Sequence, residues 1–314
     1  MSKWVKMGKN KPVEYDVIII GGGPGGLSAA IYTSRANLKT VFIEQGAPGG
    51  KMVKTFKIEN WSGERLIEGP DLSLRMFNHA QAFGALYKYG KVMRVDSQGP
   101  QRQVVTLSDQ TTLSAKAVII STGMTERIPT SIVGITEFEN RGVSYCAICD
   151  GPLFKDQPMA VIGGGNSALE EAAYLTSVAS HVYVFVRKPE ELIAEKKLIQ
   201  DATHKKNLTI FTSGEIKRLI GKDQLEAIEA TVDGQDVKMN ISAVFPYIGH
   251  IPNSQLVAHL GVSDPVGFIE TDHYMETKVP GIYAVGDVRS KEVRQIATAV
   301  ADGVIVGKIL ANRI

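Results

Sequence analysis

The feature that most constrains this chain is a strand, glycine turn, helix and second strand that occur in the same order twice. In the first copy, residues 14–20 are short, β-branched and ended by glycines, which predicts a buried strand. A helix over 25–36 and a strand over 40–44 complete a βαβ unit. Residues 159–187 repeat this order. The repeat predicts an α/β fold with two doubly wound, Rossmann-like nucleotide-binding domains.

The domain boundaries follow from later segments of the chain. Three of them combine an apolar strand with a tight turn: 117–123, 243–250 and 281–287. A terminal helix is expected over 295–311. At 314 residues there is room for two medium domains or one large one. We expect a second nucleotide-binding domain, 125–252, inserted in a first domain formed by 1–124 and 253–314.

Composition excludes several classes of protein. Hydrophobic residues make up 44% and charged residues 22%, as in a soluble globular protein, and the net charge of +2 is too small to indicate nucleic acid binding. No apolar run approaches the roughly 20 residues that span a bilayer. Residues 1–12 carry lysines but lack the apolar core of a secretory signal. We therefore expect a cytoplasmic protein that binds neither nucleic acid nor membrane.

The first glycine turn has the G-x-G-x-x-G pattern of a dinucleotide site at Gly21, Gly23 and Gly26, with Pro24 at the start of the helix. The first glycine allows the tight turn, the second allows backbone to approach a pyrophosphate, and the third allows close packing. Glu44 ends the second strand, where a carboxylate accepts from ribose hydroxyls. A merely structural turn is the alternative, which the strand, helix and terminal acid together disfavour.

The second turn has the related pattern G-x-G-x-x-A. Its residues are Gly163, Gly165, Asn166, Ser167 and Ala168. Aligning the two units places Arg187 opposite Glu44, with Lys188 next. A carboxylate repels a ribose 2′-phosphate and a basic residue attracts it, so the first turn suits FAD and the second NADPH. Alternatively, both basic residues are solvated turn residues, and Glu190 and Glu191 weaken the positive field.

The only two cysteines form a C-x-x-C motif, Cys146 and Cys149, followed directly by Asp150. Thiols at this spacing can close a small disulfide ring, and the thiolate of one is the nucleophile. Asp150 is close enough in sequence to act as the acid and base for that chemistry. A redox dithiol between two dinucleotide turns indicates electron transfer from a nucleotide to a disulfide.

The cysteines, Asp150 and the histidines each allow another interpretation. The cysteines could form a structural disulfide or half of a zinc site, but the chain has no second C-x-x-C and no H-x-x-x-H, so no metal is expected. Asp150 could be a cap or turn residue. The six histidines are scattered and are interpreted as surface or turn residues.

Together these residues resemble the low-molecular-weight thioredoxin reductases over essentially the whole chain. The matching segments are 21–26, 49–50, 59–61, 122–123, 146–151, 163–168, 249–253, 286–287 and 294–295. The resemblance implies a class II, FAD-dependent pyridine nucleotide-disulfide oxidoreductase that acts on thioredoxin as a homodimer. The FAD residues expected on this basis are the Gly21 turn, Glu44, Gly50, Lys51, Asn60, Thr122, Gly123, Gly286, Asp287, Arg294, Gln295 and Ile296.

The resemblance also implies a rotation of the two domains. The nicotinamide and the dithiol belong to one domain, yet both must reach the same flavin. Residues 122–125 and 249–252 would form the hinge, consistent with their glycines. Which cysteine would face the flavin is left open.

The chain departs from the family pattern at two places. The usual His-Arg-Arg with a further arginine is replaced by Val-Arg-Lys at 186–188, with Leu-Ile at 192–193. Each lost contact to phosphate would cost on the order of 1.5–3 kcal/mol, which puts the preference for NADPH in doubt. Lys51 stands where the family commonly has glutamine, near the expected flavin.

Four alternatives of similar fold stay open. A ferredoxin-dependent thioredoxin reductase would not need the second nucleotide, and a dithiol oxidase would pass electrons to oxygen. The C-x-x-C-D motif disfavours both a non-catalytic FAD-binding redox sensor and a ferredoxin–NADP reductase, because neither needs a dithiol.

Overall fold

The computed structural model describes residues 14–55, 58 and 60–314. Residues 1–12, which we expect not to form a secretory signal, lie outside the described residues. Glu59, the first residue of the 59–61 motif, also lies outside them. The described residues divide into two units. The first comprises the residues up to Met124 and Pro252–Ile314, and the second is Thr125–Ile251.

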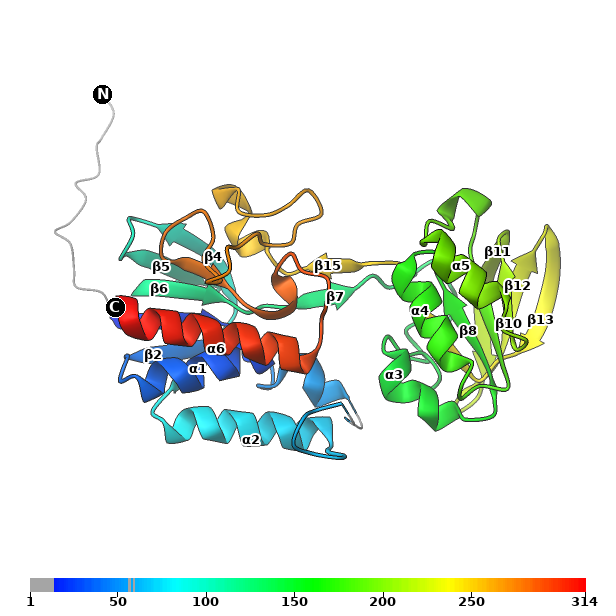
Figure 1. Cartoon of the computed structure of the whole chain (residues 1–314), viewed down its shortest axis with the longest axis horizontal. Helices are drawn as coiled ribbons and strands as arrows, with labels where there is room; N and C mark the ends of the chain where they lie inside the picture. The colour runs from blue at the N-terminus through cyan, green and yellow to red at the C-terminus, as the bar shows by residue number, and fades with distance from the viewer. Residues whose placement is uncertain (1–13, 56–57, 59) are drawn as a thin grey trace, which may run out of the picture. The chain divides into compact units, whose positions relative to one another are not determined.

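A seven-stranded sheet forms the centre of the first unit (Figure 1). Its strands are β1 (Tyr15–Ile20), β2 (Thr40–Glu44), β3 (Leu86–Tyr89), β4 (Val92–Ser97), β5 (Gln103–Leu107), β6 (Thr112–Ile120) and β16 (Ile282–Ala284). The order is β3-β2-β1-β6-β5-β4, and β16 pairs with β6. Strands β3, β2, β1, β6 and β16 are parallel, whereas β4, β5 and β6 pair antiparallel. The parallel part of this sheet is the one that the first βαβ unit predicts.

Both faces of this sheet are covered. The helical segments of the unit are α1 (Pro24–Arg35), α2 (Gly69–Ala82), α6 (Ile296–Arg313) and the 3-10 turns η1 (Gly50–Lys54), η4 (Gln255–Leu260) and η5 (Gly286–Val288). Val17 and Ile19 of β1 pack with α1, α2 and α6 on one face, and Ile18 and Ile20 pack with β4, β5 and η4 on the other. Alternate residues of one strand therefore fill two apolar cores.

Helices α1 and α6 pack closely because two glycines of α6 carry no side chain. A Cβ on Gly303 would lie 2.4 Å from the Gly25 carbonyl oxygen, and one on Gly307 would lie 2.5 Å from Tyr32 Cβ. The last helix of the chain is thereby fixed against the helix that follows the first glycine turn.

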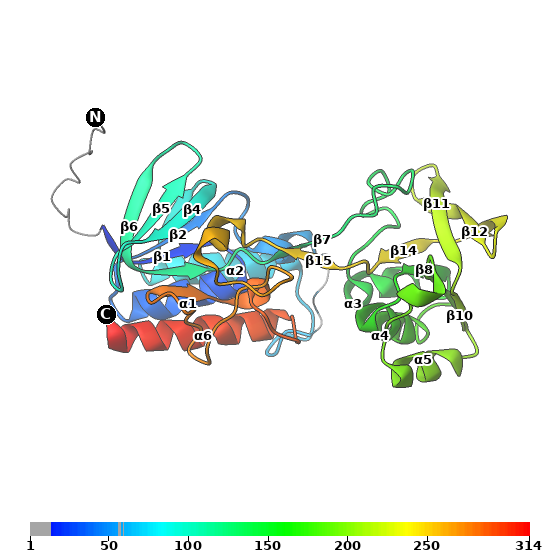
Figure 2. The ribbon, with the colours of Figure 1, turned by 90° about the horizontal axis from the view of Figure 1, so that it is seen from above.

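The second unit contains two smaller sheets. A parallel sheet has the order β10-β9-β8-β14, and an antiparallel one the order β11-β12-β13. The strands are β8 (Pro158–Ile162), β9 (His181–Phe185), β10 (Leu208–Phe211), β11 (Gly214–Gly221), β12 (Leu225–Val232), β13 (Gln235–Asn240) and β14 (Ala243–Pro246). The helical segments are α3 (Ala147–Asp150), η2 (Gly151–Phe154), α4 (Asn166–Leu175), η3 (Pro189–Glu191) and α5 (Lys196–Thr203). Figure 2 shows β11 and β12 on the other side of the parallel sheet from α4.

Two short strands lie where the chain passes between the units. Strand β7 (Met124–Glu126) pairs with β15 (His250–Pro252). Gly123 precedes the first and Gly249 the second, with φ of 64° and 106°. Both glycines thus hold backbone conformations that other residues rarely adopt.

The predicted α/β class is confirmed, and the strands and helix predicted for the first βαβ unit fall within one residue of the observed ones. In the second unit, β8, α4 and β9 follow one another in the predicted order. Strand β6 begins earlier than predicted, at Thr112.

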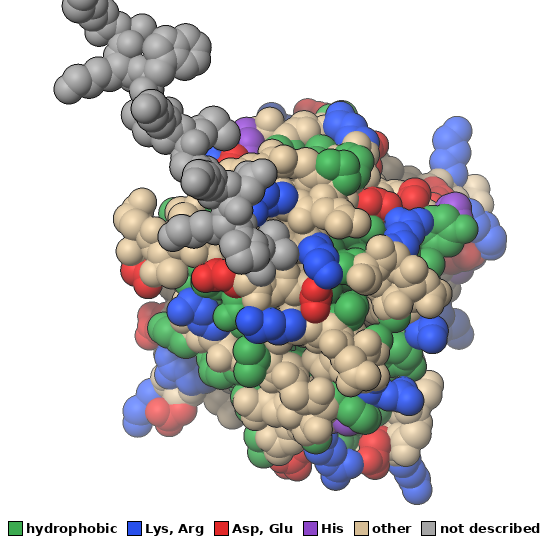
Figure 3. Space-filling model, turned by 90° about the vertical axis from the view of Figure 1, so that its left-hand side faces the viewer, with side chains coloured by type: hydrophobic (Ala, Val, Ile, Leu, Met, Phe, Trp, Pro, Cys, Tyr) green, Lys and Arg blue, Asp and Glu red, His purple; other side chains and the backbone are tan. Residues whose placement is uncertain are grey.

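The molecular surface agrees with the small net charge. On the face drawn in Figure 3, Lys and Arg side chains are interspersed with Asp and Glu. Within the described chain, no helix combines the length and the apolar character needed to cross a membrane.

Candidate active site

The first glycine turn leaves open space beside one of its glycines. Gly21 has a φ of 104°, and a Cβ there would lie 2.3 Å from the Ser121 carbonyl oxygen. A Cβ on Gly26 would lie 2.1 Å from the Gly21 carbonyl oxygen, whereas one on Gly23 would meet no atom within 4 Å. Helix α1 begins at Pro24 with no side-chain cap and no acid in its first turn. Its first backbone N–H groups can therefore bind a phosphate over Gly23.

Glu44 is anchored to this turn. Its Oε2 accepts the Gly22 N–H at 2.8 Å and its Oε1 accepts the Gly46 N–H at 2.8 Å. Each carboxylate oxygen keeps further acceptor capacity for a ribose hydroxyl. The Gly49 N–H donates to the Gly22 carbonyl at 2.7 Å, so the turn that carries Gly50 also lies against this site.

Asp287, in η5, has a buried carboxylate oxygen, Oδ1, without a hydrogen-bond partner among the described residues. Burial raises the pKa of this carboxyl, and the positive charges of Lys291, Lys51 and Arg294 oppose the rise. Buried acceptors are almost always hydrogen-bonded in native proteins. The orphaned oxygen therefore fits a ligand group that donates a hydrogen bond, as a flavin nucleotide hydroxyl does.

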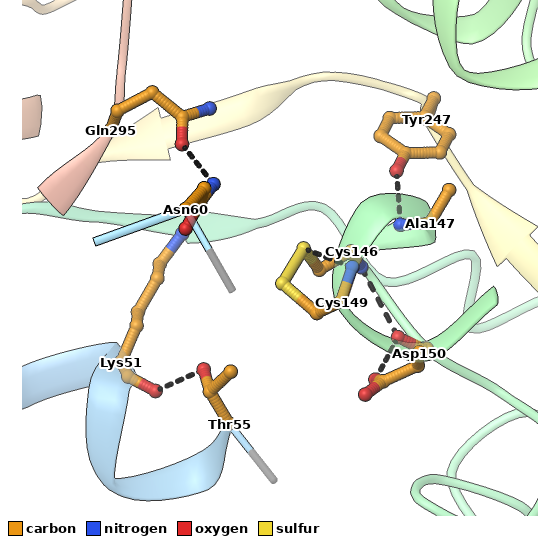
Figure 4. The surroundings of a disulfide bond; sticks show 10 residues. Lys51, Thr55, Asn60, Cys146, Ala147, Cys149, Asp150, Tyr247 and Gln295 are labelled. Carbon is orange, nitrogen blue, oxygen red and sulfur yellow. Dashed lines mark hydrogen bonds between the residues drawn. A yellow bond between two sulfur atoms is a disulfide. The ribbon is translucent and has the colours of Figure 1, made fainter. Parts of the chain in front are cut away.

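The start of α6 is built around Gln295. Its side chain and that of Thr298 form a capping box, and its Oε1 accepts from Asn60 Nδ2 at 3.1 Å (Figure 4). Arg294 lies over the Phe268 ring at 4.2 Å from its centroid. Ile296, the first residue of the helix, follows directly. The structure thus brings residue 60 next to 294–296, which sequence separation alone does not predict.

Gly286 and Thr122 are held by polar contacts of their own. The Gly286 N–H donates to the buried Asp302 Oδ2 at 2.9 Å, and Asp302 also binds Arg289 at 2.8 Å. The Thr122 hydroxyl donates to the Asn253 carbonyl at 2.6 Å. Gly123 accepts the Asn253 N–H at 3.0 Å through its carbonyl.

The second glycine turn repeats the first in the second unit. Gly163 has a φ of 138°, and a Cβ there would lie 2.3 Å from the Tyr247 carbonyl oxygen. A Cβ on Gly165 would meet no atom within 4 Å. Asn166 and Ser167 then open α4, and Ala168, the third position of the pattern, is buried. As at Gly23, the middle glycine leaves the space that a pyrophosphate needs.

Arg187 follows the end of β9, as predicted, but its guanidinium is already paired. Its Nε and Nη2 donate to the two carboxylate oxygens of Glu191, at 3.1 Å each. Lys188 precedes η3 as its N-cap residue. The positive charge expected for a 2′-phosphate is therefore partly neutralised by a neighbour.

Cys146 and Cys149 form a disulfide across the short helix α3 (Figure 4). The Cys149 N–H donates to Cys146 Sγ at 3.3 Å. Both cysteines are half-buried, so the disulfide is only partly shielded from solvent. No group of three metal-ligating side chains occurs among the residues that the structure describes.

Asp150 is connected to the cysteines through Ser144. The Ser144 hydroxyl donates to Asp150 Oδ2 at 2.5 Å and accepts the Cys146 N–H at 3.1 Å. Burial raises the pKa of Asp150, and the bond from Ser144 opposes the rise. Asp150 is thus a part-buried carboxyl tied to the disulfide segment.

Three residues near the disulfide were not predicted. Ser144 is one; Tyr247 and Glu171 are the others. The Tyr247 hydroxyl accepts the Ala147 N–H at 2.9 Å (Figure 4). Glu171, on α4, has an Oε2 without a partner in the described structure, and burial raises its pKa to about 7. Only Tyr247 had a signal in the sequence, since it lies in the predicted strand and turn 243–250.

The whole chain is similar to proteins of known family. The family described as pyridine nucleotide-disulphide oxidoreductase matches residues 15–303. The chain is 53% identical over 300 residues to a thioredoxin reductase of Mycoplasmopsis pulmonis, covering 96% of this chain and 97% of that protein. It is 43% identical over 297 residues to a thioredoxin reductase of Bacillus subtilis, covering 94% and 93%.

A solved structure agrees with these relatives. The crystal structure of a thioredoxin reductase from Streptococcus pyogenes superimposes with a TM-score of 0.85 at 40% identity, covering 95% of this chain and 97% of that one.

Proposed function

Because this chain belongs to the pyridine nucleotide-disulphide oxidoreductases, and among them to the thioredoxin reductases, we propose that it reduces thioredoxin with electrons from NADPH. The electrons pass through FAD to the Cys146–Cys149 disulfide. One observation carries the proposal: a half-buried disulfide tied to a part-buried carboxyl occurs in a chain with two open glycine turns.

The residues of the first unit fit FAD. The open space beside Gly23, the anchored Glu44 and the orphaned Asp287 oxygen suit a pyrophosphate, a ribose and a further hydroxyl. Bound FAD would supply a two-electron carrier between nicotinamide and disulfide. The Gly163 turn, with Arg187 and Lys188, would hold NADPH.

The dithiol step follows from the chain's own groups. Two electrons and two protons convert the Cys146–Cys149 disulfide to two thiols. One cysteine gives its proton to the Asp150 carboxylate, and its thiolate attacks the thioredoxin disulfide to form a mixed disulfide, while the released thioredoxin thiolate takes that proton from Asp150. The second cysteine then gives its proton to the Asp150 carboxylate and attacks the mixed disulfide. The Cys146–Cys149 bond re-forms, the second thioredoxin thiolate takes the proton from Asp150, and reduced thioredoxin leaves.

Domain rotation is part of the proposal. The flavin turn belongs to the first unit, and the nicotinamide turn and the disulfide belong to the second. Alternating access to the flavin therefore needs movement at the two connections, where Gly123 and Gly249 have positive φ.

A cytoplasmic homodimer is also proposed. A working dithiol suits a reducing compartment. Leu86, Tyr87 and Tyr89, on the edge strand β3, are 49%, 36% and 71% exposed, which suits burial against a second copy. Sedimentation of the purified protein tests the dimer.

An anaerobic titration of the holoenzyme with NADPH, followed through the visible flavin band, tests whether NADPH is the electron donor. Bleaching by NADPH is expected, with turnover of thioredoxin that is lost in Cys149→Ser while flavin stays bound. Unchanged turnover in that variant would refute the dithiol pathway. Failure of both NADPH and NADH to bleach the flavin would favour a ferredoxin or dithiol donor instead.

A further inference from the structure

We propose that Glu191 is a specificity-determining residue of the nucleotide site in the second unit. It lowers the discrimination between a donor with a ribose 2′-phosphate and one with a 2′-hydroxyl, so that the chain accepts NADH beside NADPH. This inference rests on the proposed donor site and concerns a carboxylate to which that function assigns no role.

Glu191 is held against the second glycine turn by its backbone. A Cβ on Gly164 would lie 2.3 Å from the Glu191 carbonyl oxygen. The N–H groups of Ile193 and Ala194 both donate to the Gly164 carbonyl at 2.9 Å. The segment that carries Glu191 therefore lies directly on the turn over which a dinucleotide pyrophosphate would bind, and its carboxylate belongs to the same site.

The Glu191 carboxylate occupies the donors that a 2′-phosphate would use. Arg187 offers Nε and Nη2 as a planar fork, and both bind Glu191 at 3.1 Å. Arginine recognises phosphate with this same pair of donors. A 2′-phosphate must therefore displace the carboxylate from Arg187 or bind the guanidinium through its remaining N–H groups.

Exposure decides how strong this competition is. The Arg187 side chain is 63% exposed and that of Glu191 37%, so water screens their pair and a phosphate can displace it. After displacement, however, the carboxylate charge stays beside a phosphate of like charge. A ribose 2′-hydroxyl meets no such repulsion and can donate to Glu191, as it does to an acidic residue in NAD sites. The net effect is weakened binding of NADPH relative to NADH.

Isothermal titration calorimetry of the oxidised holoenzyme with NADP⁺ and, separately, NAD⁺ tests the inference. Glu191→Gln removes the charge and keeps the side-chain size. We expect NADP⁺ to bind about 3- to 10-fold more tightly in this variant, from the loss of one like charge at an exposed site, with NAD⁺ unchanged or weaker. Glu190→Gln is the matched control, because Glu190 is an exposed neighbour in the same turn, and both affinities should stay within about twofold.

A double variant separates the competition of Glu191 for Arg187 from the repulsion between the Glu191 charge and the phosphate. Because Glu191 both competes for Arg187 and repels the phosphate, the gain for NADP⁺ should be smaller in Arg187→Ala/Glu191→Gln relative to Arg187→Ala than in Glu191→Gln relative to the wild type. An unchanged NADP⁺/NAD⁺ ratio in Glu191→Gln, or an equal gain in Glu190→Gln, would overturn the inference while leaving the proposed donor site intact. Absence of binding of both nucleotides to the wild-type protein would overturn that site as well.

Discussion

The hydroxyl of Ser144 donates a 2.5 Å hydrogen bond to Asp150 Oδ2 and accepts the backbone N–H of Cys146. The proposed proton-transfer group and the disulfide segment are thereby joined through one small side chain. The relationship has a direct consequence for the pH dependence of the enzyme.

Ser144→Ala should shift the pH profile of thioredoxin reduction. Burial raises the pKa of Asp150 and the Ser144 bond opposes this, so its loss raises the pKa further. The protonated acid then persists to higher pH, and the limb of the profile that needs it should move up by about 0.5–1 pH unit. Stopped-flow reoxidation of the two-electron-reduced enzyme by thioredoxin measures the limb. A profile identical to wild type would show that Asp150 does not govern this step.

Tyr247→Phe should destabilise helix α3, which carries the disulfide. It removes the acceptor of the Ala147 N–H at the start of α3, leaving a part-buried donor unpaired, and should lower the free energy of unfolding by about 1–3 kcal/mol. Denaturant unfolding measures the loss. Tyr183→Phe is the control, since Tyr183 stacks on Phe211 and no hydrogen bond of its hydroxyl is seen in the described part of the chain. Equal losses in both variants would assign the effect to the ring environment.

Alanine at two glycines of the first turn should have different effects. At Gly23 a Cβ enters open space, so Gly23→Ala should fold normally yet bind FAD more weakly. At Gly26 a Cβ would lie 2.1 Å from a carbonyl oxygen, so Gly26→Ala should destabilise the unit itself. Flavin content of the purified protein and thermal unfolding of the flavin-free form separate the two. Full flavin content in Gly23→Ala would place the pyrophosphate elsewhere.

Glu171 should make stability depend on pH. Its pKa is raised from 4.5 to about 7 by burial and by Glu170, so the folded state binds its proton more tightly than the unfolded state. This stabilisation is complete below about pH 4.5 and is lost as the pH rises through about 7. In Glu171→Gln that loss, about 1–3 kcal/mol, should disappear. Denaturant unfolding at pH 5, 6, 7 and 8 tests this, and parallel curves for variant and wild type would contradict it.

Local signals explain what could be predicted. The strands around the glycine turns are short apolar runs ended by glycine, a pattern that lies within about thirty residues of sequence even though β1 also pairs with the distant β6. The roles of the Glu44 carboxylate and of the cysteine pair are likewise predicted from their spacing along the sequence. For the same reason the first βαβ unit could be predicted to within one residue, and the second in its order of elements.

Contacts between distant segments could not be predicted. Tyr247 binds a backbone group 100 residues away, and Asn60 binds a side chain 235 residues away. The antiparallel sheet β11–β13 was not predicted, although Asp233 and Gly234, between β12 and β13, form the Asp-Gly pair typical of a two-residue hairpin turn. Arg187 follows β9, but its pairing with Glu191 depends on the turn η3, which a charge count along the sequence does not reveal.

The packing of α6 on α1 constrains the order in which the two units can fold during translation. The second unit is one continuous segment, Thr125–Ile251, so it can fold while the ribosome is still translating the rest of the chain. The first unit cannot complete its fold earlier, because Gly303 and Gly307 pack against α1 only after α6 has been synthesised. The nascent chain would therefore expose the apolar face of its first sheet until α6 has left the ribosome, and the flavin site of the first unit would be complete only then.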